Sequence, residues 1–293
     1  MEKDINSVLG HTVTYPQNYQ PDILVPIPRH TNRSRVGIST PLPFGGVDVW
    51  HAYEASCLTN SGLPTAGLLK IVVPACSPFI VESKSLKLYL NSFNMERLGR
   101  TAAEANTQMA QTVRRDLSRL LCADVAVNFF NCDAPTAPTP ETDSRFSVIE
   151  DAPGAASTPI SCYSESPSLL TPIDAATKTQ FLKSHLLRSN CPVTSQPDWG
   201  TIYVAIEGER HVDPVSLLRY IVSLRAENHF HEEICELVFK RLQDALAPSS
   251  LSIMCRYTRR GGIDITPIRH SAPASPWDSI AATDNLTMRV DRM

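Results

Sequence analysis

The 293-residue chain has no long uninterrupted apolar run, no C-x-x-C pair and no large excess of charge of either sign. Its longest apolar run, residues 68–75, contains Lys70 and Pro74 and is far shorter than the ~20 residues of a membrane-spanning helix. The spacing of the eight cysteines argues against a cysteine-based zinc site. At a net charge of −3 the chain has no general attraction for nucleic acid or an anionic membrane, so we expect neither as a partner and favour small molecules.

Two further absences bear on location and cofactor binding. The first six residues, Met-Glu-Lys-Asp-Ile-Asn, contain no apolar segment like that of a secretory signal. We therefore expect a cytoplasmic protein whose cysteines are free thiols. The chain also has no G-x-G-x-x-G, which excludes a Rossmann unit as the means of holding a dinucleotide.

The composition changes sharply in residues 133–173, which are rich in proline and serine. This segment predicts a linker, with a short strand near residues 145–150. We therefore expect an N-terminal unit in residues 1–132 and a C-terminal unit in residues 174–293. A weak internal repeat supports two related units, because four positions match at a constant offset of 131: Ser85 with Ser216, Leu86 with Leu217, Tyr89 with Tyr220, and Ser92 with Ser223.

Each unit shows the same order of patterns. Apolar, partly alternating runs at residues 68–81 and 201–207 predict strands. Asp213-Pro214 is typical of a helix start, and the repeat predicts a second such start after Glu82. Steps of three and four mark a second helix in each unit, with apolar residues at Met109, Val113, Leu117, Leu120 and Leu121, and at Phe230, Ile234, Leu237, Val238, Leu242 and Leu246.

Residues 251–257 and 263–266 predict two further strands joined by Arg259-Arg260-Gly261-Gly262, where the glycines suit a tight hairpin. The sequence of elements is thus strands, two helices and strands, twice over. It predicts an α+β protein in which antiparallel sheets are each packed with two helices.

Cys191 stands out among the cysteines because it alone has an acid seven residues later, Asp198, within a turn-rich segment. A working thiol needs a lowered pKa or a nearby base, together with partial exposure. This pairing indicates a nucleophile with its own proton source. A buried structural cysteine is the alternative interpretation.

Three further clusters could carry chemistry. Residues 82–89 place a carboxylate, hydroxyls and lysines at a helix start, where backbone N–H groups favour anions; a capping serine with solvated charges explains them as well. Residues 227–233 contain His229 and His231 beside glutamates, which suits an acid/base histidine, a metal site of unusual spacing or a solvated helix start. Arg259 and Arg260 beside two glycines suit a phosphate or an ordinary exposed hairpin.

Together these motifs resemble one family. The order Glu-Ser-Lys-Ser-x-Lys-x-Tyr, Asn-Cys-x-x-x-x-Gln-Pro-Asp-Trp-Gly, Phe-His-Glu and Arg-Arg-Gly-Gly is similar to that of the long, two-unit NADPH-dependent 7-cyano-7-deazaguanine reductases, the nitrile reductases of queuosine biosynthesis. The resemblance extends to Trp50-His-Ala-Tyr-Glu54 and to Leu88-Tyr-Leu-Asn-Ser-Phe-Asn94. It implies two tandem tunnelling-fold units that pair their sheets, a homodimer, and a site at unit junctions.

The resemblance also implies roles for individual residues. Cys191 would attack the nitrile carbon to give a thioimide, Asp198 would supply a proton and His231 would assist proton transfer. Two NADPH would be consumed per nitrile as hydride donors, with no metal required. The implied substrate contacts are Glu82, Ser83, Lys84, Phe230, His231 and Glu232, and the implied cofactor contacts are Lys84, Ser85, Arg260 and Gly261.

Two departures from the family pattern are the unusual linker and Cys57, which stands where relatives often carry a bulky aromatic. Three alternatives remain. A nitrilase-type hydrolase would use the same thioimide with water and no NADPH. A zinc-dependent GTP cyclohydrolase shares the implied fold but would need metal ligands. A non-catalytic binder of pterins or deazapurines would use the two glutamates alone.

Overall fold

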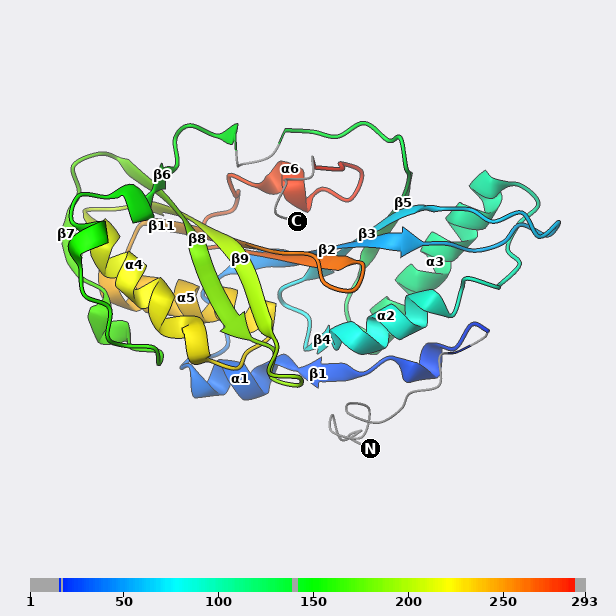
Figure 1. Cartoon of the computed structure of the whole chain (residues 1–293), viewed down its shortest axis with the longest axis horizontal. Helices are drawn as coiled ribbons and strands as arrows, with labels where there is room; N and C mark the ends of the chain where they lie inside the picture. The colour runs from blue at the N-terminus through cyan, green and yellow to red at the C-terminus, as the bar shows by residue number, and fades with distance from the viewer. Residues whose placement is uncertain (1–15, 17, 139–141, 288–293) are drawn as a thin grey trace.

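A computed structural model describes residues 16, 18–138 and 142–287, so the N-terminus discussed above lies outside the described residues. One sheet of eight strands has the order β5-β3-β2-β12-β11-β9-β8-β6 (Figure 1). Its neighbouring strands are antiparallel, except that β6 pairs with β8 in parallel. Their bounds are β2 Gly45–Ala55, β3 Gly67–Pro74, β5 Ala126–Asn131, β6 Ser147–Val148, β8 Thr179–Asn190, β9 Pro197–Glu207, β11 Ser250–Tyr257 and β12 Ile263–His270.

Helices cover one face of this sheet. Figure 1 shows α2, α4 and α5 on one side and the short α6 on the other. Two apolar cores lie beneath the helices, one for each half of the chain, and a third core packs under α6 on the opposite face. The helices are α1 Arg29–Arg35, α2 Ser83–Asn91, α3 Ala102–Leu121, α4 Pro214–Ser223, α5 His231–Leu246 and α6 Asp278–Ala281.

The two halves of the chain meet within the sheet. Strand β2 of the first half pairs with β12 of the second along its length, from Ala52 opposite Ile263 to Gly45 opposite His270. The junction therefore contains a continuous backbone ladder. Any site at the ends of β2 and β12 draws residues from both halves.

The internal repeat has a structural basis in the first helix of each half. Glu82 caps α2 by accepting from the Ser85 N–H at 2.7 Å, and Asp213 caps α4 by accepting from the Ser216 N–H at 2.7 Å. The two serine hydroxyls also make equivalent bonds, each donating to the carbonyl of its cap residue. The matched positions thus build the same helix start twice, which confirms the predicted helices after Glu82 and Asp213.

The first predicted strand run is divided in two. Within residues 68–81 the chain forms β3 and then β4 (Phe79–Val81), separated by a turn in which the Ser77 N–H donates to the Pro74 carbonyl. Strand β4 leaves the main sheet and pairs with β1 (Pro26–Pro28). The proline explains the break, because it ends the ladder and starts a turn.

The predicted linker is built onto the second half in its described part. It contributes β6, which lies in the expected region, and β7 (Pro172–Asp174), which pairs with β10 (Arg210–Val212). Ile149, Ala155 and Leu170 are buried in the core of that half, next to short 3-10 helices at Ile149–Asp151, Ala155–Ser157 and Pro167–Leu169. Apolar residues among the prolines thus anchor this segment. The domain boundaries themselves stay a prediction.

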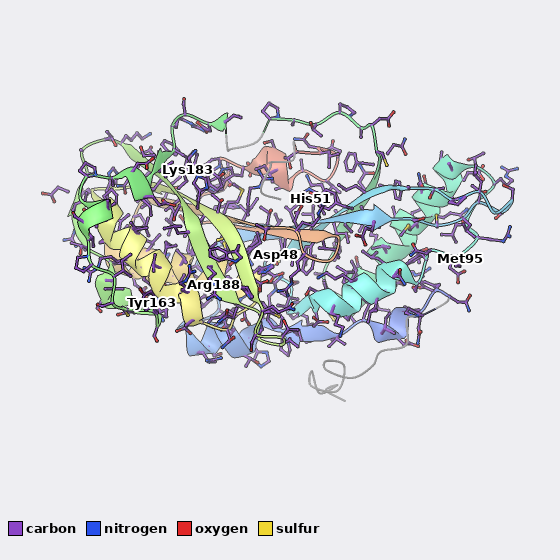
Figure 2. All side chains as sticks on the ribbon, in the orientation of Figure 1. Asp48, His51, Met95, Tyr163, Lys183 and Arg188 are labelled. Atoms are coloured by element: carbon purple, nitrogen blue, oxygen red, sulfur yellow. The ribbon has the colours of Figure 1, made fainter. Side chains whose placement is uncertain are left out.

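Figure 2 shows how the fold distributes polar and apolar side chains, with Asp48 in the middle of the molecule and Met95 near one end. Asp48 is 1% exposed, whereas Met95 is 63% exposed. A charged group in the interior needs partners, and those of Asp48 lie beside the candidate site. No helix within the described ranges has the length and apolar character needed to cross a membrane.

Candidate active site

The hairpin of β8 and β9 brings Cys191 and Asp198 together. Ser189 of β8 lies opposite Asp198 of β9, and the six residues from Cys191 to Gln196 form the connecting loop. The Cys191 N–H donates to the Gln196 carbonyl at 2.9 Å, which closes the loop. The spacing of seven residues noted in the sequence is therefore the length of a hairpin connection.

The Cys191 side chain is buried, at 7% exposure, yet its surroundings are polar. Burial raises the pKa of the thiol, but hydrogen bonds from the Thr194 hydroxyl, the Thr194 and Val193 N–H groups and Arg260 outweigh it. The net effect lowers the pKa of Cys191 below its ordinary value. This is the environment of an activated thiol rather than of an inert structural cysteine.

Asp198 lies between two basic side chains. Its Oδ1 forms an ion pair with Arg260 Nη1 at 2.8 Å, although the geometry of this contact is not that of a hydrogen bond. Its Oδ2 is 3.3 Å from His231 Nε2. The His231 ring stacks on Tyr257 with centroids 3.8 Å apart and planes 12° apart. His231 Nδ1 is buried and has no hydrogen-bond partner in the described part of the chain. The pair thus combines a carboxylate and an imidazole that can hold or move a proton.

Residue 231 is positioned by the end of β8. The Asn190 N–H donates to the Glu227 carbonyl at 2.8 Å, and the His229 N–H donates to the Asn190 carbonyl at 3.1 Å. The Glu233 carboxylate reaches back to the Phe230 N–H at 3.1 Å and caps the start of α5. These bonds fix the first turn of α5 next to the residue before Cys191.

Glu232 is a buried acid, 2% exposed, and its Oε1 has no hydrogen-bond partner among the described residues. Burial and the neighbouring Asp48 raise the pKa of Glu232 to about 8, although Arg29 and Arg269 act in the opposite direction. An unpartnered buried carboxyl is costly, so it indicates a position for a ligand that donates hydrogen bonds.

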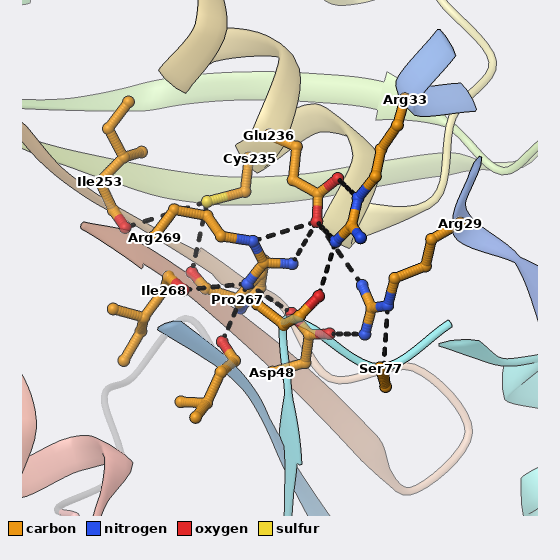
Figure 3. A network of polar contacts seen from close by, with 12 residues as sticks. Arg29, Arg33, Asp48, Ser77, Cys235, Glu236, Ile253, Pro267, Ile268 and Arg269 are labelled. Atoms are coloured by element: carbon orange, nitrogen blue, oxygen red, sulfur yellow. Dashed lines mark hydrogen bonds and ion pairs between the residues drawn. The ribbon is translucent and has the colours of Figure 1, made fainter. Parts of the chain in front are cut away.

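One turn further along α5, Glu236 belongs to what we call the buried ion network, defined as Arg29, Arg33, Asp48, Glu236 and Arg269 (Figure 3). Arg269 Nη2 is 2.8 Å from Glu236 and its Nη1 is 2.8 Å from Asp48. Arg33 Nη2 is 2.7 Å from Glu236, and Arg29 pairs with Asp48. The network joins α1, β2, α5 and β12, and therefore both halves of the chain.

A small cavity collects these groups. It has a volume of about 20 Å³ and is lined by both halves: by Trp50, Val81 and Ser83 of the first, and by Cys191, Pro192, Asp198, Phe230, His231, Glu232, Arg260 and Ile265 of the second. This volume holds little more than one water molecule. The turn that follows Cys191, which contributes Pro192 to this lining, is mostly exposed.

A second cavity of about 60 Å³ lies on the other side of the Arg260 turn, lined by Ala52, Glu54, Lys87, Leu90, Asn91, Asn94, Gly261, Gly262 and Ile263. Gly261 and Gly262 have φ of +59° and +76°, which glycine adopts without strain, and a Cβ on Gly261 would come within 3.3 Å of the Lys87 side chain. Burial and Arg260 lower the pKa of Lys87, while Glu82, Asp198 and Cys191 oppose them. Lys87 thus lies within electrostatic reach of the first cavity.

Most of the predicted site residues meet at the first cavity, but four do not line it: Gly261, which lines the second cavity, and Glu82, Lys84 and Ser85. Glu82 is 3% exposed, and both of its carboxylate oxygens accept backbone N–H groups of α2. Ser85 is fully buried, and its hydroxyl accepts from the Val25 N–H and donates to the Glu82 carbonyl. Lys84 is half-buried beside them. For the Ser85 hydroxyl to donate to a cofactor, its bond to the Glu82 carbonyl would have to break, so that role stays a prediction.

Sequence reasoning assigned no role to Lys87, Thr194 or Trp50. Lys87 belongs to the Glu-Ser-Lys-Ser-x-Lys-x-Tyr motif and stands four residues, or one helical turn, after Ser83. That spacing could have indicated that the two side chains lie on the same face of the helix. Thr194 lies within the Cys191 loop, and its hydrogen bond to the thiol follows from how that loop folds. The burial of Trp50 in β2 follows only from the pairing of the two halves.

No group of three or more His, Cys, Asp or Glu residues within the described ranges could hold a metal ion. The expectation that no metal is required stays a prediction.

A cavity lined by both halves holds a thiol, a carboxylate–imidazole pair and a buried acid, an arrangement typical of an enzyme active site, and comparisons with known proteins give the family. Residues 15–129 match the family described as "Nitrile reductase, 7-cyano-7-deazaguanine-reductase N-term", and residues 197–275 match "QueF-like protein". An "NADPH-dependent 7-cyano-7-deazaguanine reductase" of Coxiella burnetii (strain RSA 331 / Henzerling II) is 44% identical over 271 residues, 91% of this chain and 92% of the relative. One of Chromobacterium violaceum is 39% identical over 278 residues, 94% of this chain and 95% of the relative.

The chain belongs to the family of NADPH-dependent 7-cyano-7-deazaguanine reductases, which are oxidoreductases that act on a nitrile. A solved structure, "Crystal structure of the archaeosine synthase QueF-Like in the apo form", is 17% identical, covers 34% of this chain and 100% of that chain, and has a TM-score of 0.32. That likeness is too low to carry an argument about the fold.

Proposed function

We propose that the chain reduces 7-cyano-7-deazaguanine to 7-aminomethyl-7-deazaguanine with two NADPH, as a step of queuosine biosynthesis. The proposal rests on one observation above all. A single cavity holds a thiol of lowered pKa, a carboxylate-imidazole pair and a buried acid with an unpartnered oxygen. Those are the groups that addition to a nitrile, proton transfer and recognition of a donor edge require.

In this mechanism the Cys191 thiolate attacks the nitrile carbon, a C–S bond forms, and the electron pair of one C–N π bond moves to nitrogen. The Asp198–His231 pair supplies the proton that the nitrogen takes up, which gives a neutral thioimide. Arg260 holds Asp198 by its ion pair and also contacts the sulfur, so it orients the acid and favours the thiolate. The sulfur leaves again as a thiolate when the C–S bond breaks.

NADPH, when bound, supplies the two hydrides. In the second cavity the cation that its anionic parts would meet is Lys87, with Arg260 next to the lining residue Gly261 in the chain; the Glu54 carboxylate also lines this cavity. Lys84, Ser85, Arg260 and Gly261 remain the proposed cofactor contacts, to which we add Lys87. The whole reaction consumes two protons, one as the thioimide forms and one as the imine is reduced, and the Asp198–His231 pair is placed to deliver both.

The substrate ring is a 2-amino-lactam whose N–H groups form a two-donor edge. Glu232 offers an unpartnered oxygen, and each oxygen of Glu82 keeps a lone pair after capping α2. We propose that both carboxylates accept from the ring, with Ser83, Lys84, Phe230 and His231 around it. We also propose tandem tunnelling-fold units, a cytoplasmic homodimer and no nucleic-acid or membrane partner, with light scattering as the check of the dimer.

Intact-mass spectrometry tests the covalent step. After mixing with 7-cyano-7-deazaguanine, the protein should gain the mass of one nitrile, mapped to Cys191, and Cys191→Ala should gain none. The same mixture should oxidise NADPH only with unmodified Cys191. Acid formation from the nitrile without NADPH oxidation would identify a hydrolase instead, and wild-type turnover by Cys191→Ala would overturn the mechanism.

A further inference from the structure

Glu232 and the buried ion network lie on one face of α5, one turn apart. Three guanidinium groups of the network face two carboxylates, Asp48 and Glu236. The network therefore carries one positive charge in excess, in a region where each member is at least about nine-tenths buried. Ionised Glu232 would balance that excess.

Arg29 is the member best placed to act on Glu232. It is 5% exposed, its Nε donates to the Ser77 hydroxyl at 3.1 Å, and its Nη1 lies 3.6 Å from Glu236. Its Nη2 pairs with Asp48, the acid that opposes ionisation of Glu232. Fixed on three sides, the guanidinium cannot turn away from the interior.

We propose that Arg29 is a positioning residue for substrate recognition: held between Asp48, Glu236 and Ser77, it supplies the buried positive charge that lets Glu232 meet the two-donor edge of the substrate ring as a carboxylate. A carboxylate accepts two hydrogen bonds from such an edge, whereas a protonated acid brings an O–H that opposes one of the donors. This inference rests on the proposed function, because it assumes that Glu232 contacts the ring.

The charges around Glu232 come from several elements. Asp48 of β2 disfavours its ionisation, and Arg29 of α1 and Arg269 of β12 favour it. The other titratable groups near it on α5 or around the cavity are His231, Glu233, Glu236, Cys191, Asp198 and Arg260. Of the basic groups, Arg29 exerts the largest influence on Glu232, ahead of Arg269.

The test measures the affinity for 7-cyano-7-deazaguanine by calorimetry from about pH 6 to about pH 8.5, in a Cys191→Ala background that removes covalent capture and the titration of the thiol. In that background the affinity should rise with pH and level off near the Glu232 pKa of about 8. Arg29→Gln should move this rise to higher pH and weaken binding at about pH 7 by about tenfold or more, since a nearby opposite charge typically shifts a carboxyl pKa by at least about one unit. Arg29→Lys should restore much of the affinity.

Arg33→Gln is the matched control, because Arg33 lies on the same helix and pairs with Glu236 and the Ala75 carbonyl. In the Cys191→Ala background, the affinity of Arg33→Gln for the nitrile should rise over the same pH range as that of the background itself. Asp48→Asn should move the rise to lower pH, and it provides the reverse test if Arg29→Gln does not fold.

Two results would overturn this inference while leaving the proposed function intact. One is an affinity that depends on pH in Arg29→Gln just as it does in the Cys191→Ala background. The other is a rise in affinity that Arg33→Gln moves as far along the pH scale as Arg29→Gln does. If the unmodified protein neither binds the nitrile nor oxidises NADPH with it, the proposed function fails first, and this inference falls with it.

Discussion

Glu82 and Asp213 cap equivalent helices, so a comparison of variants at the two positions separates the loss of a helix cap from the loss of a ligand contact. Each caps the first helix of its half through a 2.7 Å bond to a serine N–H. Losing such a cap costs about 1 kcal/mol, which lowers the melting temperature of a chain of this size by about 2–4 °C. Glu82→Ala and Asp213→Ala should therefore destabilise the protein to a similar extent.

The two variants should differ in ligand binding. Hydrogen bonds to a charged group contribute about 1.5–3 kcal/mol, so Glu82→Ala should weaken nitrile binding by about 10-fold to 100-fold. Val81 and Ser83, the neighbours of Glu82 in the chain, line the cavity, whereas no neighbour of Asp213 does, so Asp213→Ala should bind as the parent does.

Calorimetric titration and thermal melting on the same preparations check both expectations. Equal affinity loss in the two variants would mean that Glu82 acts only as a cap. Unchanged affinity in Glu82→Ala would mean that the first half contributes no acceptor to the ring.

Three further predictions concern the thiol and the ion network. Thr194→Val should raise the pKa of Cys191 and slow its alkylation by iodoacetamide at neutral pH, because a hydrogen bond to the thiolate is lost; an unchanged rate-pH profile would contradict this. Arg269→Met removes the guanidinium that pairs with both Asp48 and Glu236 and should lower the free energy of unfolding by about 3–5 kcal/mol in urea titrations. Burial raises the pKa of Asp48 and Glu236, but the arginines outweigh it, so the folded pKa values of both acids lie below the unfolded ones. The free energy of unfolding should therefore fall as the solution is acidified below about pH 4. A free energy of unfolding that stays constant in that range would refute the pairing.

Local signals in the sequence were sufficient for α3, α4 and α5, whereas α1 and α6 were not predicted. Asp213-Pro214 marks the start of α4, and the apolar spacing from Met109 to Leu121 is the buried face of α3. The Gly261-Gly262 turn likewise lies where the sequence places it, although β12 continues to His270 rather than ending at Thr266. Each of these features depends on residues a few positions apart.

Strands β2 and β8 could not be predicted in the same way. Strand β2 is buried on both faces and carries Asp48 and His51 inside, so it shows neither a simple alternation nor an apolar run. Asp48 is tolerated there only because arginines from α1 and β12 reach it. Such partners lie far away in sequence, and no local pattern encodes them.

For the candidate site, the sequence grouped Cys191 with Asp198, and the β8–β9 register explains why. The resemblance to a family added Phe230, His231 and Glu232, which line the same cavity. The raised pKa of Glu232 and the lowered pKa of Cys191 arise from three-dimensional neighbours and were beyond sequence reasoning.

The ladder between β2 and β12 also has a practical consequence for splitting the polypeptide. A chain cut in the crossover between Asn131 and Ser147 would keep every backbone bond of that ladder, since none of them runs through the cut. Two co-expressed fragments should therefore reassemble, and because each carries only part of the cavity lining, catalysis would report their reunion.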